Sequence, residues 1–383
     1  MKMVELGEVA TIDRESIIAS GIRSGTKYLG LENVYSDGSS GPVNVDEGEL
    51  LSNKFVFGPN HLLYGKLRPY LNKITLPDFD GICSTDIIPI LPDPIKLDKR
   101  YLYYYLRTPW MIEHAVKCCS GANLPRVDPK LLAKFKIPLP PLPTQRRIAA
   151  ILDKAQALVA NDRRTLAVYD QLAKSLFLEM FGDPVRNERG WEVVTIGDLV
   201  DYMTSGSRGW AKYYVDEGET FLRIQNVRRD VLLLDDLTFV NAPDNAEAKR
   251  TCVRDGDVVV SITADLGRSA AIPKGFGTAY INQHLAILRL KKKVDPEYLS
   301  GYLATDAGAI QFARVNKGGV KAGLNFNDLR SIEVPLPPLE LQKRYTKLKL
   351  QTRGDRKKIE SSLHRSEGLF GSLLQGAFRG GLK

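Results

Sequence analysis

The chain contains one proline-rich phrase twice. Residues 136–148 read KIPLPPLPTQRRI, and residues 333–345 read EVPLPPLELQKRY. Gln145 and Gln342 occupy the same position in the two copies, and each precedes two basic residues and a long helical pattern. A duplicated strand–proline–helix unit within one chain predicts a pseudo-two-fold molecule that presents two similar surfaces.

The duplication extends well beyond this phrase. Three further pairs of segments match in the same order, namely residues 28–34 with 221–227, 81–88 with 279–286, and 97–102 with 294–299. All the offsets lie between 193 and 198 residues, which indicates a true internal repeat.

Each half is predicted to be a globular unit followed by one long helix. The expected boundaries are a first globular unit at residues 1–143, a first helix at 144–182, a second globular unit at 183–338 and a second helix at 339–383. Within the units, short β-rich runs alternate with turn residues and short helical patterns, so their class is mixed α/β. A chain of 383 residues is long enough to give both units sizeable cores.

Both long helices carry a narrow apolar stripe with a polar middle, which is typical of a coiled-coil seam. Thr144 is the expected N-cap of the first helix. The first stripe consists of Ile148, Ile151, Ala155, Leu158, Tyr169, Leu172, Leu176 and Met180, with Asp162 and Thr165 in its middle turns. The second consists of Tyr345, Leu348, Thr352, Asp355, Ile359, Leu363, Phe370, Leu373 and Ala377. Each helix would extend about 57 Å at 1.5 Å per residue. Because a single exposed helix of that length is unstable in water, the two are predicted to pack together, antiparallel.

Positive charge is concentrated in the last part of the chain. The formal net charge is +9, and residues 339–383 contain eleven Lys or Arg and four Asp or Glu, a net of +7. A basic chain often binds nucleic acid, although a solvated helix face is an equally good interpretation of this excess. No apolar run reaches membrane-spanning length, and the four cysteines have no ligand or disulfide spacing, so a cytoplasmic location is expected.

Motifs for catalysis are missing from the sequence. It contains no Asn-Pro-Pro-aromatic tetrapeptide, which an amino-methyltransferase needs, and no glycine-rich cofactor loop after a strand. The four histidines are scattered, so no metal site is expected.

Loops rich in basic, amide, hydroxyl and aromatic side chains recur in both halves. Arg and Lys can read guanine, Asn and Gln can read adenine, and hydroxyls can bind phosphate or base. Double-stranded DNA, which has approximate two-fold symmetry, is therefore the expected partner, although ordinary solvated loops remain the alternative. The candidate DNA-binding residues are Arg23, Ser24, Lys27, Lys66, Arg68, Tyr70, Asn72, Lys73, Asn123 and Arg126 in the first half, and Ser205, Ser207, Arg208, Trp210, Thr263, Arg268, Lys317, Lys321 and Asn325 in the second. Loops 204–210, 263–268 and 317–325 are expected to correspond to loops 23–27, 66–73 and 120–126.

These features resemble the specificity subunit of type I restriction-modification enzymes over essentially the full chain. The helix-start signature of that family is a Pro-Pro-Leu run followed by an acid, a glutamine, basic residues and an isoleucine. The chain departs from the signature at Thr144 and Leu341, where an acid is usual, and at the second-copy tyrosine. Residues 67–70 (LRPY), 84–88 (STDII) and 374–382 (LQGAFRGGL) also match. The signature residues expected to contact partner subunits are Gln145, Arg146, Ile148, Gln342, Lys343 and Tyr345.

The resemblance implies a non-catalytic subunit with two target-recognition domains, each of which reads one half of a bipartite DNA site. The coiled coil would set the unread spacer. The implied partners are two methyltransferase (M) subunits and, through them, restriction (R) subunits. S-adenosylmethionine, ATP and magnesium would belong to those partners, and this chain would hold no cofactor or metal.

Three alternatives remain open. The chain could be an assembly scaffold without base readout, a nuclease with an unrecognised site, or the specificity subunit of a type II restriction enzyme. A preference for a two-part DNA site would exclude the scaffold, and an absence of cleavage by the chain alone with magnesium would exclude the nuclease.

Overall fold

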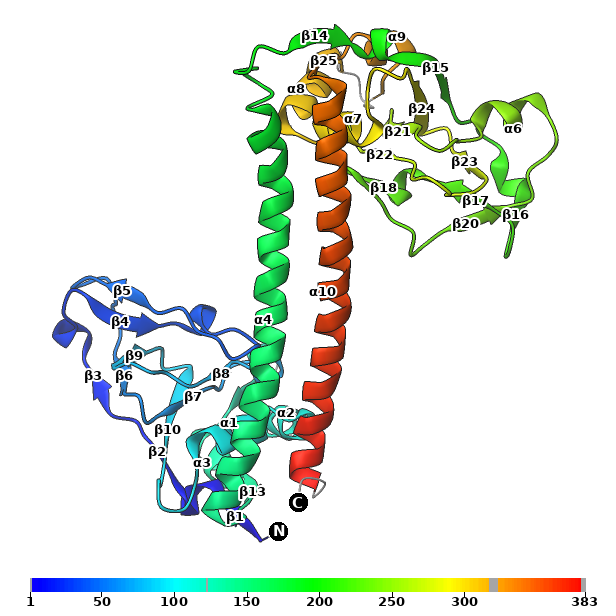
Figure 1. The fold of residues 1–383 in the computed structure, drawn as a ribbon. Coiled ribbons are helices and arrows are strands. Elements are labelled where there is room, and N and C mark those ends of the chain that lie inside the picture. The colour runs from blue at the N-terminus through cyan, green and yellow to red at the C-terminus, as the bar shows by residue number, and fades with distance from the viewer. Residues whose placement is uncertain (1, 122, 317–322, 380–383) are drawn as a thin grey trace. The chain divides into compact units, whose positions relative to one another are not determined.

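The computed structural model describes residues 2–121, 123–316 and 323–379. Its contacts divide the chain into two units, Met1–Arg164 with Glu360–Lys383, and Thr165–Ile359. The long helices α4 (Leu142–Phe181) and α10 (Leu339–Arg379) each contribute one part to either unit (Figure 1). Each unit therefore contains one globular domain and one stretch of both helices.

The first unit is built on two small sheets. One is antiparallel with the strand order β2-β10-β7-β8, and the other has the order β3-β6-β9-β4-β5 and contains the parallel pair β4–β9. The two-stranded pairs β1–β13 and β11–β12 complete it. The strands are β1 (Met3–Glu5), β2 (Ala10–Ile12), β3 (Ser16–Ile17), β4 (Thr26–Leu29), β5 (Val43–Val45), β6 (Lys54–Phe57), β7 (Leu62–Gly65), β8 (Ile74–Thr75), β9 (Gly81–Cys83), β10 (Ile87–Pro92), β11 (Cys119–Ser120), β12 (Arg126–Val127) and β13 (Lys136–Pro138). The short helices are α1 (Lys99–Leu106), α2 (Pro109–Lys117) and α3 (Pro129–Ala133).

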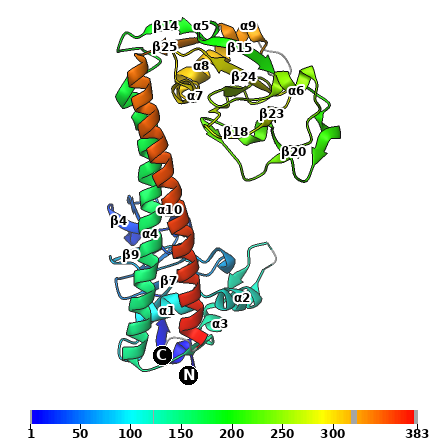
Figure 2. The same cartoon turned by 45° about the vertical axis from the view of Figure 1, so that its right-hand side comes forward.

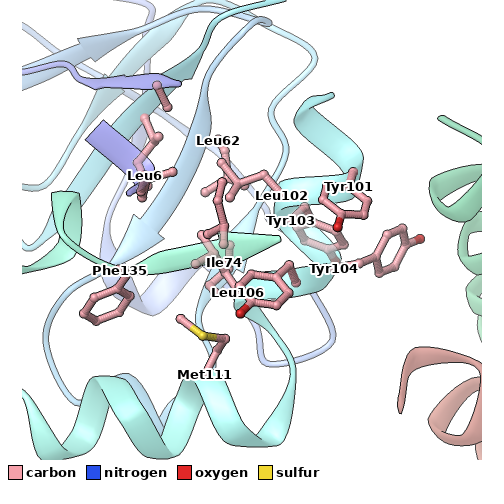
Figure 3. Packing of buried hydrophobic residues seen from close by; sticks show 14 of the residues in the cluster. Leu6, Leu62, Ile74, Tyr101, Leu102, Tyr103, Tyr104, Leu106, Met111 and Phe135 are labelled. Atoms are coloured by element: carbon pink, nitrogen blue, oxygen red, sulfur yellow. The ribbon is translucent and has the colours of Figure 1, made fainter. Parts of the chain in front are cut away.

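The tyrosine-rich helix α1 forms the centre of the first core (Figure 3). Asp98 starts the helix, because its side chain accepts hydrogen bonds from the backbone N–H groups of Arg100 and Tyr101. Tyr101 is fully buried, and its hydroxyl donates to the Pro138 carbonyl at 2.9 Å. This bond satisfies the buried hydroxyl and ties α1 to β13, the strand that begins the proline phrase.

The second unit repeats this arrangement. Its sheets have the orders β15-β24-β21-β22 and β16-β20-β17-β23, and β17–β23 is again a parallel pair. The strands are β14 (Glu192–Thr195), β15 (Val200–Ser205), β16 (Tyr214–Val215), β17 (Glu219–Leu222), β18 (Val227–Arg228), β19 (Val231–Leu232), β20 (Thr238–Val240), β21 (Val258–Ser261), β22 (Ser269–Ala271), β23 (Ala279–Ile281), β24 (Leu285–Leu290) and β25 (Glu333–Leu336). The helices are α5 (Ile196–Leu199), α6 (Ala246–Thr251), α7 (Pro296–Leu303), α8 (Asp306–Val315) and α9 (Phe326–Arg330). Asp295 caps α7, and Tyr298 donates to the Pro335 carbonyl at 2.6 Å, so the predicted repeat is confirmed down to single hydrogen bonds.

The two long helices run antiparallel within each unit, and they lie side by side in both views (Figures 1 and 2). In the first unit, Ser362 and Ser366 donate to Asp162, and Ile148 shares a core with Ala377. Residues earlier in α4 thus contact residues later in α10, as antiparallel packing requires. In the second unit, Arg356 bonds to Asp170 at 2.7 Å, and the Phe181 ring lies 5.2 Å from that of Tyr345. The predicted mixed α/β fold with two long antiparallel helices is confirmed.

Two details of the predicted helices are wrong. Helix α4 begins at Leu142, and the Pro141 carbonyl accepts from the Thr144 N–H at 2.8 Å, so Thr144 lies within the first turn and is not the N-cap. The predicted stripe is also partly out of phase, because Leu158 and Leu172 are 49% and 43% exposed while the neighbouring Val159 is buried. Adjacent apolar residues leave the phase of such a stripe ambiguous in sequence.

Candidate nucleic-acid interface

A buried glutamine closes the joint between globular domain and helix in the first unit. Gln145 has no exposed surface, its Oε1 accepts from the Asp98 N–H at 2.9 Å, and its Nε2 donates to the carbonyls of Lys96 at 2.9 Å and Pro140 at 2.8 Å. One side chain therefore links the start of α4 to the start of α1.

The same joint recurs in the second unit. Gln342 is equally buried, its Oε1 accepts from the Asp295 N–H at 2.8 Å, and its Nε2 donates to the Pro337 carbonyl at 2.7 Å. Thr346, one turn later, also donates to the Asp295 carboxylate. The duplicated phrase therefore encodes a duplicated joint.

These joints correct part of the predicted partner-contact set. Four of its six side chains are at most 3% exposed within this chain, so they have structural roles and cannot offer a partner their surface: Gln145, Ile148, Gln342 and Tyr345. Arg146 and Lys343 are exposed and remain predictions. Arg146 also lines a cavity of about 740 Å³ together with Leu142, Asp98 and Lys99.

In the first unit, two predicted loops meet at the β9–β10 turn, residues 84–86. The Lys66 N–H donates to the Asp86 carbonyl at 2.9 Å, which attaches loop 66–73 to the turn. Loop 120–126 reaches the turn through Arg126, whose Nε donates to Asp86 Oδ1 at 3.0 Å. The Arg68 N–H donates to the Pro125 carbonyl at 2.8 Å and so joins the two loops to each other. The structure thus brings Lys66, Arg68 and Arg126 together, and their contact with DNA stays a prediction.

The turn of the first site contains an ion pair between Arg126 and Asp86. The hydrogen bond from Arg126 to the Asp86 carboxylate favours the charged guanidinium and raises the pKa of Arg126. Tyr70 is 53% exposed, and Asn123 is exposed. Lys73 is partly buried and donates to the Leu31 carbonyl at 2.7 Å, so its ammonium group is anchored within the domain.

Asn72 adds an unsatisfied acceptor to loop 66–73. Its backbone has a φ of +50°, which asparagine tolerates better than most residues, and its buried Oδ1 has no hydrogen-bond partner within the described part of the protein. Buried acceptors of this kind normally have a partner, and a water or a ligand could supply one.

In the second unit, three predicted loops meet at the equivalent β23–β24 turn, residues 282–284. Ser207 forms an isolated bridge with Asn282. The Thr263 hydroxyl lies 2.6 Å from His284 Nδ1, and Thr263 also forms a bridge with Gly323. The turn therefore joins loops 204–210, 263–268 and the end of loop 317–325.

The remaining candidates of the second unit have mixed environments. Arg208 is exposed, and the Ser205 carbonyl accepts from Arg250 at 2.6 Å. Arg268 is 19% exposed at its side chain and is paired with Asp265. Asn325 is exposed and caps α9. Lys317 and Lys321 lie outside the described residues.

Trp210 is a wrong prediction. Its side chain is 5% exposed, and its ring lies 5.1 Å from the rings of both Phe221 and Tyr280. Trp210 therefore belongs to a small core of the second unit. The sequence predicts a DNA-binding role for this aromatic residue of a glycine- and serine-rich loop, but its ring packs against the sheet instead.

The predicted correspondence between loops 23–27 and 204–210 is also wrong. In the strand registers, Ile12 of β2 lies opposite Ile90 and Met203 of β15 lies opposite Leu288, so loop 204–210 corresponds to the residues directly after β2. Arg23, Ser24 and Lys27 lie at or just before the start of β4. The β9–β10 turn is reached by the other end of β4, where the Leu29 carbonyl accepts from the Ser84 N–H. The structure does not bring these three residues to the β9–β10 turn.

The turn residues themselves were missed from the sequence. Asp86 organises the first site, and His284 organises the second, where Gln283 Nε2 lies 2.9 Å from His284 Nε2. Both turns fall inside the repeat at residues 81–88 and 279–286, from which the sequence predicts a duplication and a family resemblance but no site. Polar residues between two buried strands at matching positions were the signal that could have identified them.

Within residues 2–121, 123–316 and 323–379, no group of three His, Cys, Asp or Glu side chains is arranged to hold a metal ion. Among the helices of the same residues, none is long and apolar enough to cross a membrane.

Fold and site together define a class of internally duplicated protein with two equivalent α/β domains. Each domain gathers polar loops around one turn and is joined to the long helices through a buried glutamine. A family model described as the type I restriction modification DNA specificity domain matches residues 1–167 and 188–348. The chain belongs to this family.

Curated relatives agree with this membership. The chain is 31% identical over 147 residues to the type I restriction enzyme EcoDI specificity subunit of Escherichia coli, covering 37% of this chain and 32% of the relative. It is 25% identical over 281 residues to the MjaVIII specificity subunit of Methanocaldococcus jannaschii, covering 69% of this chain and 65% of the relative. The matches thus span from about a third to about two thirds of these relatives.

Solved structures share the fold. The type I restriction-modification S subunit from M. genitalium aligns over 98% of this chain and 96% of its own, with a TM-score of 0.64 at 14% identity. A chain from a structural study of complex assembly and conformational transition in a type I R-M system aligns over 100% and 98%, with a TM-score of 0.56 at 23% identity.

Proposed function

We propose that this chain supplies the DNA sequence specificity of a type I restriction-modification complex and has no catalytic activity of its own. Each globular domain reads one half of a bipartite site with the loops gathered at its turn. The long helices set the unread spacer between the two halves. Two methyltransferase subunits bind the chain, and restriction subunits join through them. S-adenosylmethionine, ATP and magnesium belong to those partners.

The observation that carries the proposal is the repeated convergence of polar loops at one turn. The loops of Arg126, Lys66 and Arg68 meet at the turn of the first unit, and those of Thr263 and Ser207 meet at the turn of the second. These are residue types that can read base edges or bind phosphate, which supports the proposal. The two patches share a scaffold and differ in side chains. Two different half-sites require that combination.

Residues 339–383 carry +7 of the formal net charge of +9, so the rest of the chain, which includes both globular domains, has a low net charge. This distribution fits a division of DNA contacts between this chain and its partners. Phosphate contacts supply most of the salt-dependent affinity of a DNA complex, and partner subunits can supply them. Base contacts supply the sequence preference, and a few side chains for each half-site are enough for that.

Single-molecule methylation sequencing of the host genome, with and without this gene, tests the proposal. The expected result is that one bipartite adenine-methylated motif is lost when the gene is deleted. A methylome that does not change, or the loss of a short uninterrupted motif, would contradict it. Incubation of the purified chain alone with magnesium and DNA is expected to give no cleavage, and cleavage would indicate a nuclease instead.

A further inference from the structure

A lysine occupies a buried position of α10 in the second unit. Lys349 is 6% exposed and lies at the helix position that Leu152 occupies in the first copy. Its Nζ is 2.7 Å from Asp230 Oδ1 and 2.7 Å from Glu297 Oε2, and it donates to the Glu297 carbonyl at 2.7 Å. Each of the three ammonium N–H groups therefore has an acceptor.

Arg353, one turn later on α10, completes the cluster. Its Nη2 lies 2.7 Å from Asp230 Oδ2, and its Nη1 lies 3.0 Å from Glu297 Oε2. The side chains of Asp230 and Glu297 are 18% and 13% exposed. Two cations thus face two carboxylates, and three of the four side chains are largely buried while that of Arg353 is 36% exposed. The loss of any one member leaves a charge without its partner. We call these four residues the positioning cluster.

The positioning cluster reaches the DNA-reading loop through Asp230. This residue has a φ of +62° at the tip of the β18–β19 hairpin, and its N–H donates to the Ser269 carbonyl at 2.7 Å. Its Oδ1 also accepts from the Ser300 hydroxyl of α7 at 2.6 Å. Ser269 directly follows Arg268 of loop 263–268. The cluster therefore fixes the base of this loop to α10.

The first unit holds the equivalent hairpin by different chemistry. Asp37 takes the place of Asp230, and its backbone carbonyl accepts from Arg107 Nη1 at 3.0 Å and from Gln156 Nε2 at 3.2 Å. Leu152 and Gln156 stand on α4 where Lys349 and Arg353 stand on α10. The matching helix positions thus hold an apolar residue and a neutral amide, and the charged contacts to this hairpin come from Arg107 and from Arg163, which lies 3.9 Å from the Asp37 carboxylate. A buried lysine at this helix position is therefore not a requirement of the fold.

We propose that Lys349 and Arg353, through Asp230 and Glu297, position the reading loop of the second domain on α10 and so control discrimination at one half-site only. This inference rests on the proposed function, because it assumes that loop 263–268 reads DNA. The four residues are positioning residues and make no base contact themselves. Neutralising Lys349 removes one charged contact that holds the hairpin tip, although Arg353 and Ser300 still bond to Asp230, and so loosens the attachment of the loop to α10. The first domain keeps its own contacts.

The test is methylome sequencing of the host carrying full-length variants of the gene. The readout for each half-site is a discrimination ratio, the methylated fraction at fully matched sites divided by that at sites with one changed base in that half. Arg126→Ala and Arg268→Ala assign the halves to the first and second domains. Lys349→Met is expected to lower the discrimination ratio of the second half-site about tenfold, which is within the range for the loss of one base preference. The ratio of the first half-site is expected to change by less than about twofold.

Two further variants separate positioning from stability. Lys349→Arg keeps the charge and is expected to retain the second-half ratio within about threefold. Leu152→Met, at the matching position of the first copy, is expected to leave both ratios within about twofold. If Lys349→Met does not fold, Glu297→Gln takes its place, since the Glu297 carbonyl still accepts from Lys349, and the same one-sided loss is expected.

The outcomes are distinguishable. An unchanged second-half ratio in Lys349→Met, or an equal loss at both halves, overturns the inference and leaves the proposed function standing. A wild-type gene that produces no bipartite motif overturns the proposed function and this inference with it. A loss confined to the second half and restored by Lys349→Arg is the result that the positioning cluster predicts.

Discussion

Substitution of the joint glutamine tests how the duplicated phrase works. Gln145→Met keeps a similar side-chain volume but removes the hydrogen bonds to the Asp98 N–H and to the carbonyls of Lys96 and Pro140. A typical buried hydrogen bond contributes about 1 kcal/mol net, so the three bonds predict a loss of about 3 kcal/mol. Gln342→Met removes two recorded bonds and predicts about 2 kcal/mol by the same reasoning.

The measurement is urea unfolding combined with hydrogen exchange of α1 and α7. Faster exchange is expected in α1 for Gln145→Met and in α7 for Gln342→Met, because each glutamine is bonded to the start of the helix in its own unit. For a unit of this size the first change corresponds to a fall in melting temperature of about 6–12 °C. The control is Arg146→Ala, an exposed neighbour expected to stay within about 0.5 kcal/mol.

A loss of unfolding free energy in Gln145→Met no larger than that in Arg146→Ala would refute a stabilising role for the glutamine bonds. Such a result would mean that water replaces the amide at the joint without loss, so that the glutamine would have to be explained by something other than its internal bonds. A loss of protection in both units for either substitution would contradict the assignment of one joint to each domain.

Four further predictions follow from single features. Gly38→Ala places a methyl group against Tyr103 in a backbone with a φ of +92°, so it is expected to lower the unfolding free energy measured in urea by about 1–3 kcal/mol. An unchanged unfolding free energy would contradict this close packing at Gly38. The hydrogen bond that the Asp13 carboxylate accepts from the Glu15 backbone N–H is the main cause that lowers the pKa of Asp13. The ionised carboxylate therefore stabilises the fold fully above the unfolded pKa of about 4, and this stabilisation is lost as pH falls through the lower folded pKa. Urea midpoints measured across this range should therefore fall less steeply with acid in Asp13→Asn. Arg126→Ala and Arg268→Ala should each relax base preference at one half-site only, and equal losses in the methylome would argue against independent domains. Deleting about one heptad from both long helices should change the tolerated spacer while each half-site is kept, and an unchanged spacer would refute the role of the helices as a ruler.

The architecture could be predicted because its signals are local and repeated. Asp98 and Asp295 begin helices by capping their own first turns, and the proline phrase marks the same change from strand to helix in both copies. Both kinds of signal depend on neighbours a few residues away, so they can be read from one sequence. The repeat then supplied the pairing of the halves.

The environment of a residue could not be predicted where it depends on partners distant in sequence. Lys349 looks like a solvated lysine until Asp230 and Glu297, 119 and 52 residues away, are brought beside it. Trp210 looks like a loop aromatic until Phe221 and Tyr280 close around it. Neither environment can be inferred from spacing, because it is created by the sheet topology.

Sheet topology also explains why the loops proposed to read DNA gather where they do. Strands β7 and β10 are neighbours, with Gly65 opposite Ile87, so the loop that leaves β7 must start beside the turn that enters β10. Strands β21 and β24 repeat this, with Ser261 opposite Leu285. The scaffold thus delivers a loop and a turn to the same place in both domains, whatever their side chains. At that place Asp86 has an arginine partner and His284 a threonine partner, so the repeat preserves the location of the site and leaves its chemistry free to differ. A protein that reads two unlike half-sites with one duplicated fold needs this separation of scaffold from side chains.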